Sequence, residues 1–326
     1  MRALTISTTG SLDAVECSTD VAVPVITGPG QVRVRLRAAA LNHLNLWAIR
    51  GLPGVTVTPK WVLGSDGTGV IEEVSDDVSS VQRGDRVVIN AGLSCRRCEY
   101  CLAGEHPLCV KFRVLGEQVP GTFAEQVVLP ATNVRAIPPG VSDADAGAFG
   151  LAALTAWRML VSRAQIRAGD EVLIWGIGGG VAQAALLIAK ALGADELINH
   201  SGIDVGREVR ARTGKRGVNV VVDSVGTATW EQSLGALGRA GRLVTCGGTS
   251  GHLLQMDVRK LFWNQWTIMG STMGSDGEFD AVVAELVAGR LSVPVDSVFP
   301  LARGRDALER LEGGMHFGKI VLQISP

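Results

Sequence analysis

The N-terminal third of the chain alternates hydrophobic and polar residues with a period of two. The run QVRVRLRAAALN at 31–42 shows this most clearly, and shorter β-rich runs lie at 67–74, 84–90 and 121–130. Successive side chains of a β-strand point to opposite faces, so the pattern predicts short strands with one buried face. Gly-Asp and Pro-Gly pairs between several runs mark turns. We therefore expect a small β-barrel or sandwich in this region.

The pattern changes near Pro138-Pro139-Gly140. Residues 142–161 have the composition of a helix, with Ser142 or Asp143 as its N-cap. From Asp170 onward, apolar runs alternate with helical segments, which is typical of a parallel, doubly wound α/β sheet. The expected strands are 171–175, 196–199, 218–222, 242–246 and 267–270, and the expected helices are 180–193, 204–213, 229–238 and 277–289.

The composition limits the classes of function. The chain has 326 residues, enough for two domains, and a formal net charge of −1 gives no electrostatic reason to expect nucleic acid or membrane as a partner. Glycine or charged residues interrupt each apolar stretch before about 18 residues, so no transmembrane helix is expected. The start MRALTISTTG has no apolar signal-peptide core. We expect a cytoplasmic protein, whose six cysteines would not form disulfides.

A glycine-rich turn joins a predicted strand to a predicted helix in EVLIWGIGGGVAQAALLIAKALG, residues 171–193. Such a turn presents backbone N–H groups at a helix N-terminus to the pyrophosphate of a dinucleotide. A glycine-rich turn without a ligand is the alternative. The residues predicted to contact the cofactor are Gly176, Gly178, Gly179, Gly180 and Val181.

The segment after this helix does not complete the expected unit. A dinucleotide fold continues with a second strand that ends in Asp or Glu, about 20 residues after the turn, for the ribose hydroxyls. Asp195 and Glu196 precede the next apolar run instead of ending it. If that run is the second strand, the ribose would be contacted by the neutral residues Asn199, His200 and Ser201.

Four cysteines lie within the run CRRCEYCLAGEHPLC with the spacing C-x2-C-x2-C-x7-C. Four thiolates in one loop can close a tetrahedral shell around zinc and leave no position for substrate, so the predicted site is structural. An iron–sulfur cluster uses the same ligands and is an alternative, as are unrelated free thiols. The predicted ligands are Cys95, Cys98, Cys101 and Cys109.

These motifs resemble those of the medium-chain dehydrogenase/reductase superfamily. The resemblance rests on AAALNHLNLW, VLGSDGTGVIEEV, GDRVVIN, the four-cysteine loop, GTFAEQVVLP, LTAWRML, WGIGGGVAQAA, GRLVTCGGTSG, IMGSTMGS and HFGKIVL, which together span nearly the whole chain. It implies a GroES-like β-barrel domain at 1–137 and 294–326, and a Rossmann domain with a doubly wound parallel sheet at 138–293. It also implies a homodimer or homotetramer that transfers a hydride between NAD or NADP and a small-molecule substrate.

The resemblance also identifies the positions at which zinc-dependent alcohol dehydrogenases of this family hold a catalytic zinc. In this chain, Asn42 and Ser65 occupy two of these positions, and a third position falls near residues 149–150. Asp66, next to Ser65, is the only remaining residue that could bind a metal. One carboxylate cannot supply a catalytic site with three protein ligands. We therefore expect one structural zinc, no catalytic zinc, and a substrate already activated by conjugation, such as a quinone, an enone or another activated C=C.

The candidate catalytic residues are Asn42, His43 and Asp66, and the resemblance adds Gly247, Gly248 and Thr249 to the cofactor site. Three roles are open for His43: contact with the cofactor pyrophosphate, proton donation, or a structural role. Asn42 would orient the substrate or stabilise a developing negative oxygen.

The leading hypothesis is an NAD(P)(H)-dependent oxidoreductase acting on an activated C=C, enone or quinone. One alternative is an alcohol or aldehyde dehydrogenase, and another is a dinucleotide-binding sensor without turnover. By the resemblance, residues 197–199 correspond to the third strand of the sheet. The second strand and the helix that follows it are therefore missing near residue 194. Either the natural protein contains a segment that this sequence lacks, or the unit is deleted; the apolar surface that a deletion would expose favours the former. The residues that separate NAD from NADP are therefore not identified.

Overall fold

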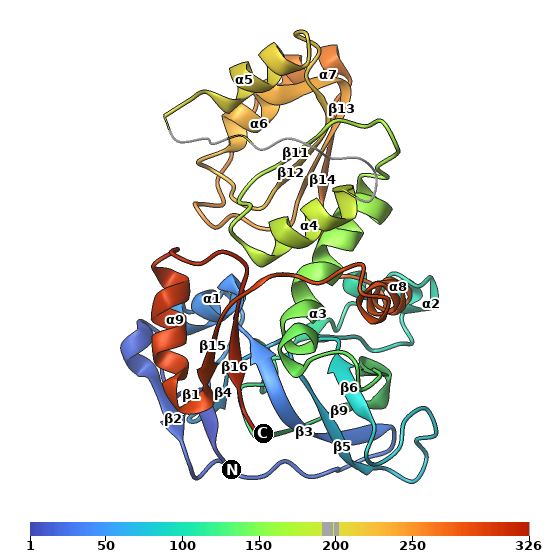
Figure 1. The fold of residues 1–326 in the computed structure, drawn as a ribbon, viewed down its shortest axis with the longest axis vertical. Coiled ribbons are helices and arrows are strands. Elements are labelled where there is room, and N and C mark those ends of the chain that lie inside the picture. The colour runs from blue at the N-terminus through green and yellow to red at the C-terminus, as the bar shows by residue number, and fades with distance from the viewer. Residues whose placement is uncertain (191–197, 199–201, 326) are drawn as a thin grey trace. The chain divides into compact units, whose positions relative to one another are not determined.

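The computed structural model describes residues 1–190, 198 and 202–325, and Figure 1 shows the course of the chain. The chain forms two compact units, each described by itself. Unit 1 comprises Met1–Ala152 and Gly274–Pro326, and unit 2 comprises Ala153–Met273. Helix α8 (Asp276–Val287) therefore belongs to unit 1, while the domain limits expected at 137/138 and 293/294 stay a prediction.

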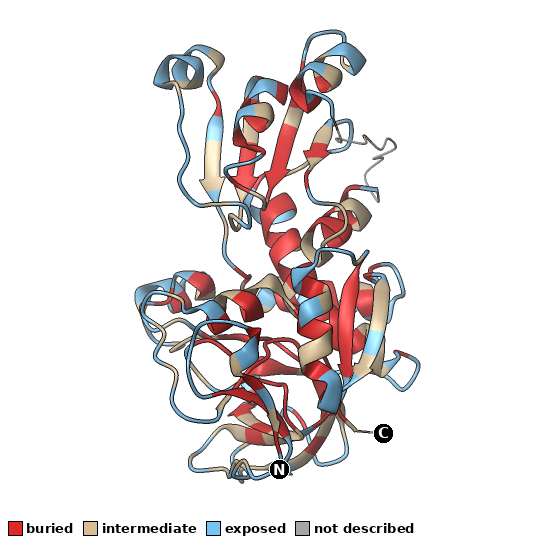
Figure 2. Cartoon of the chain, turned by 90° about the vertical axis from the view of Figure 1, so that its left-hand side faces the viewer, coloured by how far each residue is buried: buried red, intermediate tan, exposed pale blue. Residues whose placement is uncertain are grey.

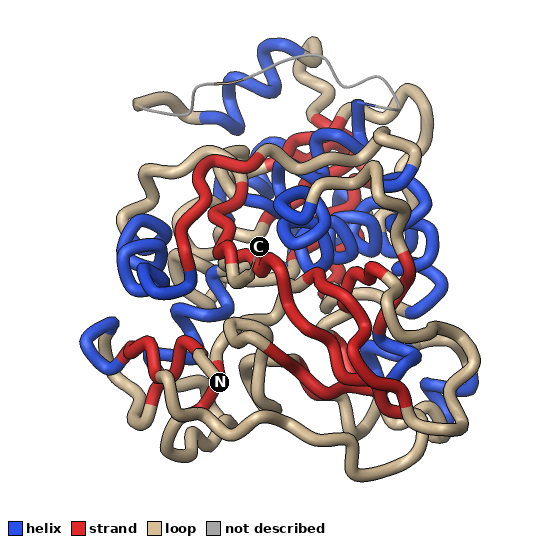
Figure 3. The backbone as a smooth tube through the Cα atoms, turned by 60° about the horizontal axis from the view of Figure 1, so that its bottom comes forward, coloured by secondary structure: helices blue, strands red, loops and turns tan. Residues whose placement is uncertain are grey.

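Unit 1 is built around a seven-stranded sheet with the order β10-β6-β5-β3-β16-β15, in which β9 also pairs with β3. Neighbouring strands are antiparallel except β15 and β16, which are parallel. Figure 3 shows strands of this sheet side by side. The bounds are β3 (Gln31–Ala40), β5 (Thr68–Val74), β6 (Arg86–Ile89), β9 (Gln126–Pro130), β10 (Val134–Ala136), β15 (Val295–Pro300) and β16 (Lys319–Gln323).

The predicted alternation is present in β3, where Val32, Val34 and Leu36 are fully buried between less buried arginines. A smaller sheet has the order β2-β1-β4, and β7 pairs with β8. The bounds of these strands are β1 (Ala3–Ile6), β2 (Val15–Ser18), β4 (Trp61–Val62), β7 (Gly92–Leu93) and β8 (Arg113–Val114).

The helices of unit 1 are short apart from α3 and α8. Their bounds are α1 (His43–Arg50), α2 (Glu99–Leu102), α3 (Asp143–Trp157), α8 (Asp276–Val287) and α9 (Gly304–Glu312), with 3-10 turns at Leu12–Ala14, His106–Leu108, Ala131–Asn133 and Leu301–Arg303. The start of α3 agrees with the predicted cap, since the Ser142 hydroxyl accepts from the N–H of Asp145 at 3.1 Å. Buried residues, red in Figure 2, are concentrated along the strands and along α3.

Three glycines hold two loops of unit 1 in backbone contact. A Cβ on Gly121 would lie 2.1 Å from the carbonyl oxygen of Gly64, and a Cβ on Gly116 would lie 2.5 Å from the same atom. Gly64 and Gly116 also have positive φ values of 101° and 81°, which favour glycine. The hydroxyl of Thr122 donates to the carbonyl oxygen of Asp66 at 2.5 Å. Together these contacts fix the backbone of the segment that carries Asp66.

Unit 2 contains a parallel sheet with the order β11-β12-β13-β14. Parallel neighbours need crossover connections, and α6 and α7 provide them between β12, β13 and β14. The strands are β11 (Val172–Ile174), β12 (Val218–Asp223), β13 (Leu237–Thr245) and β14 (Thr267–Gly270). The helices are α4 (Gly180–Lys190), α5 (Val205–Arg212), α6 (Trp230–Ala236) and α7 (Val258–Asn264), and a π-helix at Arg158–Arg163 continues α3.

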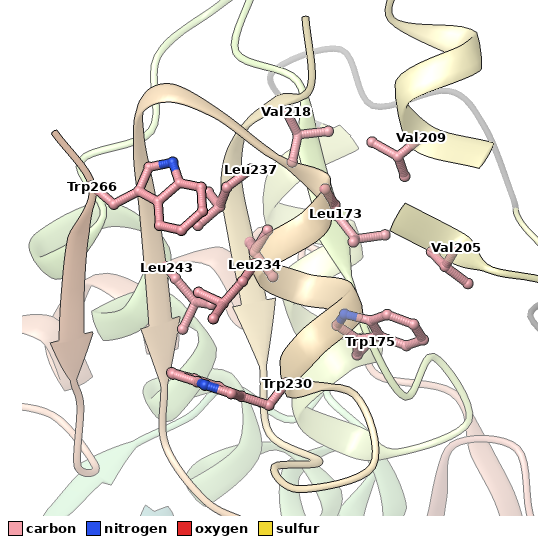
Figure 4. Packing of buried hydrophobic residues seen from close by; sticks show 12 residues of the cluster. Leu173, Trp175, Val205, Val209, Val218, Trp230, Leu234, Leu237, Leu243 and Trp266 are labelled. Carbon is pink, nitrogen blue, oxygen red and sulfur yellow. The ribbon is translucent and has the colours of Figure 1, made fainter. Parts of the chain in front are cut away.

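The core of unit 2 packs aromatic and branched side chains between the sheet and the helices. Leu243 of β13 lies among Trp230, Leu234 and Trp266 in Figure 4, and each is at least nine-tenths buried. The indole N–H of Trp266 donates to the carbonyl oxygen of Gly238 at 2.8 Å. Large aromatic side chains contribute much apolar burial, provided that their N–H groups find a partner.

Most expected elements after residue 140 are present in the described part of the chain. The helices α1, α2, α7 and α9 were not predicted. Helix α7 contains no fully buried residue, so its amphipathic signal is weak. The expected strand 196–199 lies outside the described residues, apart from Ile198. Within the residues that the structure describes, no helix combines the length and the apolar character that a membrane crossing requires.

Candidate functional site

The four predicted zinc ligands lie together in unit 1. Their Sγ atoms are all within 4.8 Å of one another, and the Sγ of Cys101 lies 4.0 Å from that of Cys95 and 3.5 Å from that of Cys98. Zn–S bonds of about 2.3 Å in a tetrahedron place sulfur atoms about 3.8 Å apart. The cluster therefore fits a structural zinc. It is the one group of three or more His, Cys, Asp or Glu ligands found among the described residues.

Backbone N–H groups point at these sulfur atoms and favour the thiolate form that zinc binds. The N–H groups of Cys95 and Lys111 donate to the Sγ of Cys109 at 3.2 and 3.3 Å. The backbone N–H of Cys101 lowers the pKa of Cys98 to about 6, whereas burial raises the pKa of Cys101 to about 11. A bound metal displaces the remaining protons, which couples metal binding to pH.

The zinc lobe, which we define as residues 91–117, is tied to α8 through Asp276. The guanidinium of Arg96 forms an ion pair with the Asp276 carboxylate, and His106 Nε2 lies 3.5 Å from the same group. Asp276 is the first residue of α8, where a carboxylate also interacts favourably with the helix dipole. Ordering of the lobe is thereby linked to a helix that lies far away in the sequence.

A second polar cluster, the Asp66 cluster, consists of Asn42, Asp66 and Lys319. Asn42 follows β3 and precedes α1, Asp66 lies between β4 and β5, and Lys319 begins β16. The pairing of β16 with β3 brings Lys319, near one end of the chain, close to Asn42 and Asp66, near the other end. The side chains of Asp66 and Lys319 are only 1% and 3% exposed.

The contacts of this cluster are short and account for both oxygens of the carboxylate. Lys319 Nζ lies 3.0 Å from Asp66 Oδ2 and donates to Asn42 Oδ1 at 2.6 Å. Asn42 Nδ2 donates to Asp66 Oδ2 at 2.9 Å, and the N–H of Leu151 donates to Asp66 Oδ1 at 2.6 Å. A buried carboxylate is stable only when it is paired in this way.

Among the described residues, the positions that the resemblance assigns to a catalytic zinc carry few metal-binding side chains. Asp66 already has an ammonium as its counter-ion, and the hydroxyl of Ser65 donates to the carbonyl oxygen of Leu115 at 2.7 Å. At the third expected position, Gly150 offers no side chain; a Cβ there would lie 3.0 Å from Asp66 Oδ1. The donors present are an amide and one paired carboxylate, whereas zinc favours imidazole and thiolate.

His43 lies at the start of α1, and its ring centroid is 6.2 Å from that of His316. Burial lowers the pKa of His43, and the positive charges of Lys319 and Arg50 and a protonated His316 lower it further. Burial is also the main cause that lowers the pKa of His316. The Nδ1 atom of His316 is buried and has no hydrogen-bond partner among the described residues. Both imidazoles are therefore expected to be neutral at pH 7.

In unit 2 the predicted cofactor residues follow the carboxyl ends of β11 and β13, two parallel strands that are separated by β12. The turn at 176–179 connects β11 to α4, and Gly176 has a φ of 74°, which favours glycine. Gly247, Gly248 and Thr249 follow β13, next to β12 in the sheet. Ligands of α/β sheets bind at this edge of the sheet.

The turns after β12 and β13 are held together by backbone contacts. The N–H of Ser250 donates to the carbonyl oxygen of Val225 at 2.8 Å, and a Cβ on Gly226 would lie 2.4 Å from the carbonyl oxygen of Gly251. Asp223, at the end of β12, accepts from the N–H groups of Val225 and Gly226 at 2.9 and 3.0 Å. The buried carboxylate of Asp223 thus shapes this edge.

A wide pocket of about 1710 Å³ lies elsewhere on unit 2, lined by α5, α6 and residues 253–257 among others. None of the predicted cofactor residues lines it. Its mixed lining includes Arg207, Arg210, Trp230 and Met256. It gives no support to the cofactor site.

The structure adds Lys319 and His316 to the residues predicted from the sequence. Both belong to the HFGKIVL motif, which marks a β-run and carries no spacing signal toward Asp66. The contact between Lys319 and Asp66 spans 253 residues. Only the sheet order, with β16 beside β3, brings the two residues together.

Comparisons with known proteins cover most of the chain. A family model described as "Alcohol dehydrogenase GroES-like domain" matches residues 28–139, and one described as "Zinc-binding dehydrogenase" matches residues 192–322. The alcohol dehydrogenase of Moraxella sp. (strain TAE123) is 30% identical over 315 residues, covering 90% of this chain and 92% of that protein. The quinone oxidoreductase of Homo sapiens is 26% identical over 349 residues, covering 99% of this chain and 97% of that protein.

A crystal structure described as an NAD-dependent alcohol dehydrogenase is 39% identical, with a TM-score of 0.93 over 100% of both chains. The similarity thus extends over the GroES-like part and the Rossmann-like part. The alignment with the human protein runs over 349 positions, more than the 326 residues of this chain, so that relative contains residues without a counterpart here. On these grounds, the chain belongs to the medium-chain dehydrogenase/reductase superfamily of oxidoreductases.

Proposed function

We propose that this protein uses NADH or NADPH to reduce an activated C=C, an enone or a quinone without a catalytic zinc. The observation that carries the proposal is the Asp66 cluster. Its carboxylate is paired with Lys319 at 3.0 Å and accepts a hydrogen bond from Asn42, one of the positions that the family resemblance assigns to a catalytic zinc. A conjugated substrate needs less activation than a simple aldehyde or ketone, because its conjugation delocalises the negative charge that the incoming hydride brings.

The residues proposed to hold the cofactor are the turn at 176–181 and the loop 247–249. They offer backbone N–H groups at the start of α4 and after β13, which suits phosphate and carboxamide groups. NAD(P)H, when bound, supplies the hydride. The chain's own residues orient the substrate and stabilise the negative charge that develops on its oxygen. The four cysteines hold a zinc that orders the lobe and takes no part in this chemistry.

An alcohol or aldehyde dehydrogenase is the second candidate. The names of the relatives favour it, since both the Moraxella protein and the 39% identical crystal structure are described as alcohol dehydrogenases. The human quinone oxidoreductase, which aligns over 99% of this chain, favours the first candidate. The two candidates differ in their requirement for a second zinc, and this makes them separable.

The test combines metal analysis with two assays of the same purified protein. We expect one zinc per chain, and oxidation of NADH or NADPH with 2-cyclohexenone or 1,4-benzoquinone as acceptor. Brief treatment with a chelator that leaves the four-cysteine zinc in place should not change this rate. Two zinc ions per chain, together with alcohol oxidation that the same treatment abolishes, would instead establish the dehydrogenase. Running each assay with both cofactors assigns NAD or NADP.

We further propose that the protein forms a homodimer or homotetramer through the β14 edge of unit 2. β14 is the last strand of its sheet and is only half-buried. The neighbouring helix α7 exposes Phe262 and Trp263 to 63% and 70%. Exposed aromatic side chains beside an open strand edge are typical of an interface. Light scattering of the purified protein gives the number of copies.

A further inference from the structure

Lys319 is the component of the Asp66 cluster that retains an unused donor. Lysine is almost never fully buried unless it is paired, and the side chain of Lys319 is 3% exposed. Its ammonium group has three N–H donors. The described residues provide two acceptors, Asn42 Oδ1 and Asp66 Oδ2, so the third N–H is left without one.

The other two members of the cluster have no comparable capacity. The carbonyl oxygen of the Asn42 side chain accepts from Lys319, while its Nδ2 donates to Asp66 at 2.9 Å and, weakly, to the carbonyl oxygen of Ala40 at 3.5 Å. Both oxygens of Asp66 also have donors. A role for Asn42 as the donor to a substrate oxygen would therefore require breaking its bond to Asp66 or its weak bond to Ala40. The ammonium of Lys319 can donate without breaking one.

The charge of Lys319 is suited to the same role. Asp66 and Lys319 form a neutral pair in a buried setting, where a positive group interacts strongly with charge that appears nearby. His43 and His316 lie within electrostatic range of Lys319, and burial keeps both imidazoles in the neutral form at pH 7. Neutral imidazoles do not compete with the ammonium for a negative oxygen.

We propose that Lys319 is a catalytic residue whose ammonium group binds the carbonyl oxygen of the substrate and gives it a proton during reduction, in the role that a metal ion has in zinc-dependent relatives. This inference rests on the proposed function. The hydride from the reduced cofactor forms a C–H bond at the β-carbon of an enone, the C=C electron pair moves toward the carbonyl carbon, and the C=O pair moves to oxygen. The oxygen takes a proton from Lys319, which regains one from water, and the enol then becomes the ketone.

The first test measures binding without turnover. The protein is saturated with NAD⁺ or NADP⁺ and titrated with 4-nitrophenol, whose phenolate absorbs in the visible and resembles the negative oxygen of the intermediate. We expect wild type to bind the phenolate, and Lys319→Met to bind it at least about tenfold more weakly, with cofactor affinity unchanged within about twofold. Lys60→Met is the matched control, because Lys60 lies in an exposed ion pair with Asp20 and should change neither affinity.

The second test measures turnover and guards against a folding defect. Lys319→Met leaves Asp66 without its counter-ion, so the double variant Asp66→Asn/Lys319→Met removes both charges together and should fold. We expect both variants to lose at least about 100-fold in kcat for 2-cyclohexenone while the KM for the cofactor stays unchanged. Lys319→Arg, which keeps the charge, should recover part of the phenolate binding.

Three results would overturn the role of Lys319. One is a folded double variant that keeps wild-type phenolate binding and kcat. Another is a loss in Lys319→Met that falls on cofactor affinity, because that would place Lys319 at a cofactor phosphate. The third is an equal loss in Lys60→Met. Failure of the proposed function has a different signature: wild type would bind phenolate in a Lys319-dependent manner but would reduce neither enone nor quinone.

Discussion

Unit 1 contains two polar clusters that differ in where their positive charge comes from. The four cysteines bring sulfur ligands within 4.8 Å of one another and include no cationic side chain among them. The Asp66 cluster includes its own cation, with Lys319 Nζ 3.0 Å from the carboxylate. Negative ligands held together require a metal ion, whereas a carboxylate with a buried lysine does not. The proposal that the Asp66 cluster works without a metal therefore rests on its internal cation.

The largest effect should come from removing one zinc ligand. Structural zinc binds with an apparent 10–16 kcal/mol in zinc-finger peptides, so we expect Cys95→Ser to lower the free energy of unfolding of unit 1 by about 4 kcal/mol or more. Urea unfolding and zinc content per chain are the measurements, and protease cleavage within the zinc lobe should accompany the loss. Cys17→Ser is the control, since Cys17 lies outside the cluster. Full zinc content and unchanged stability in Cys95→Ser would mean that the cluster is not a zinc site.

An intermediate effect is expected from breaking the buried pair in the other cluster. Asp66→Asn leaves the ammonium of Lys319 without a carboxylate, and one-sided removal of a buried partner costs about 3–5 kcal/mol. The double variant Asp66→Asn/Lys319→Met should be considerably more stable than the single one. Urea denaturation of wild type, both single variants and the double variant completes the cycle. Additive losses would show that the two side chains do not stabilise each other.

The smallest effect should come from the two histidines beside the Asp66 cluster. Burial lowers the pKa of His43 and His316 from 6.5 in the folded protein, so the unfolded chain binds more protons as the pH falls below 6.5. Stability supplied by the neutral imidazoles is therefore present above pH 6.5 and is lost below it. The groups that face them are Arg50, Asp296, Arg310 and Lys319.

Urea unfolding of wild type and His316→Asn at pH 7.5 and 5.5 measures this effect. We expect the difference in unfolding free energy between the two pH values to be smaller in the variant. The pH dependence of stability that remains in the variant comes from His43 and from the carboxylates of the protein. An equal or larger pH dependence in His316→Asn would contradict the lowered pKa.

The two clusters also differ in how far the sequence could predict them. The cysteines lie within 15 residues of one another along the chain, so their spacing alone predicted the geometry that the structure contains. Asp66 and Asn42 could be selected only through the family resemblance, and Lys319 was not selected at all. No local pattern encodes a contact that depends on two strands, β3 and β16, pairing across nearly the whole chain.

Secondary structure shows the same division. The period-two run of β3 and the alternating elements from β11 to β14 were predicted because burial imposes a periodic pattern on them. Helix α7 was not predicted, since only Leu261 packs against the core while Phe262 and Trp263 are exposed. Helix α9 was also not predicted, although it buries Ala307, Leu308 and Leu311. The catalytic roles of Asn42, His43 and Asp66, and the cofactor contacts of the glycine turn, stay predictions.

The position of β16 in the sheet has a consequence for biosynthesis. Unit 2 is continuous in sequence, so it can fold while the ribosome is still producing the residues after Met273. The sheet of unit 1 cannot be completed at that stage, because β16 joins β3 to β15 and is translated after every other strand. Until then the Ala38–Ala40 end of β3 lacks the partner strand β16, and Lys319 is not beside Asp66. We therefore expect the Asp66 cluster to form only after the residues of β16 have been translated, later than unit 2 can fold.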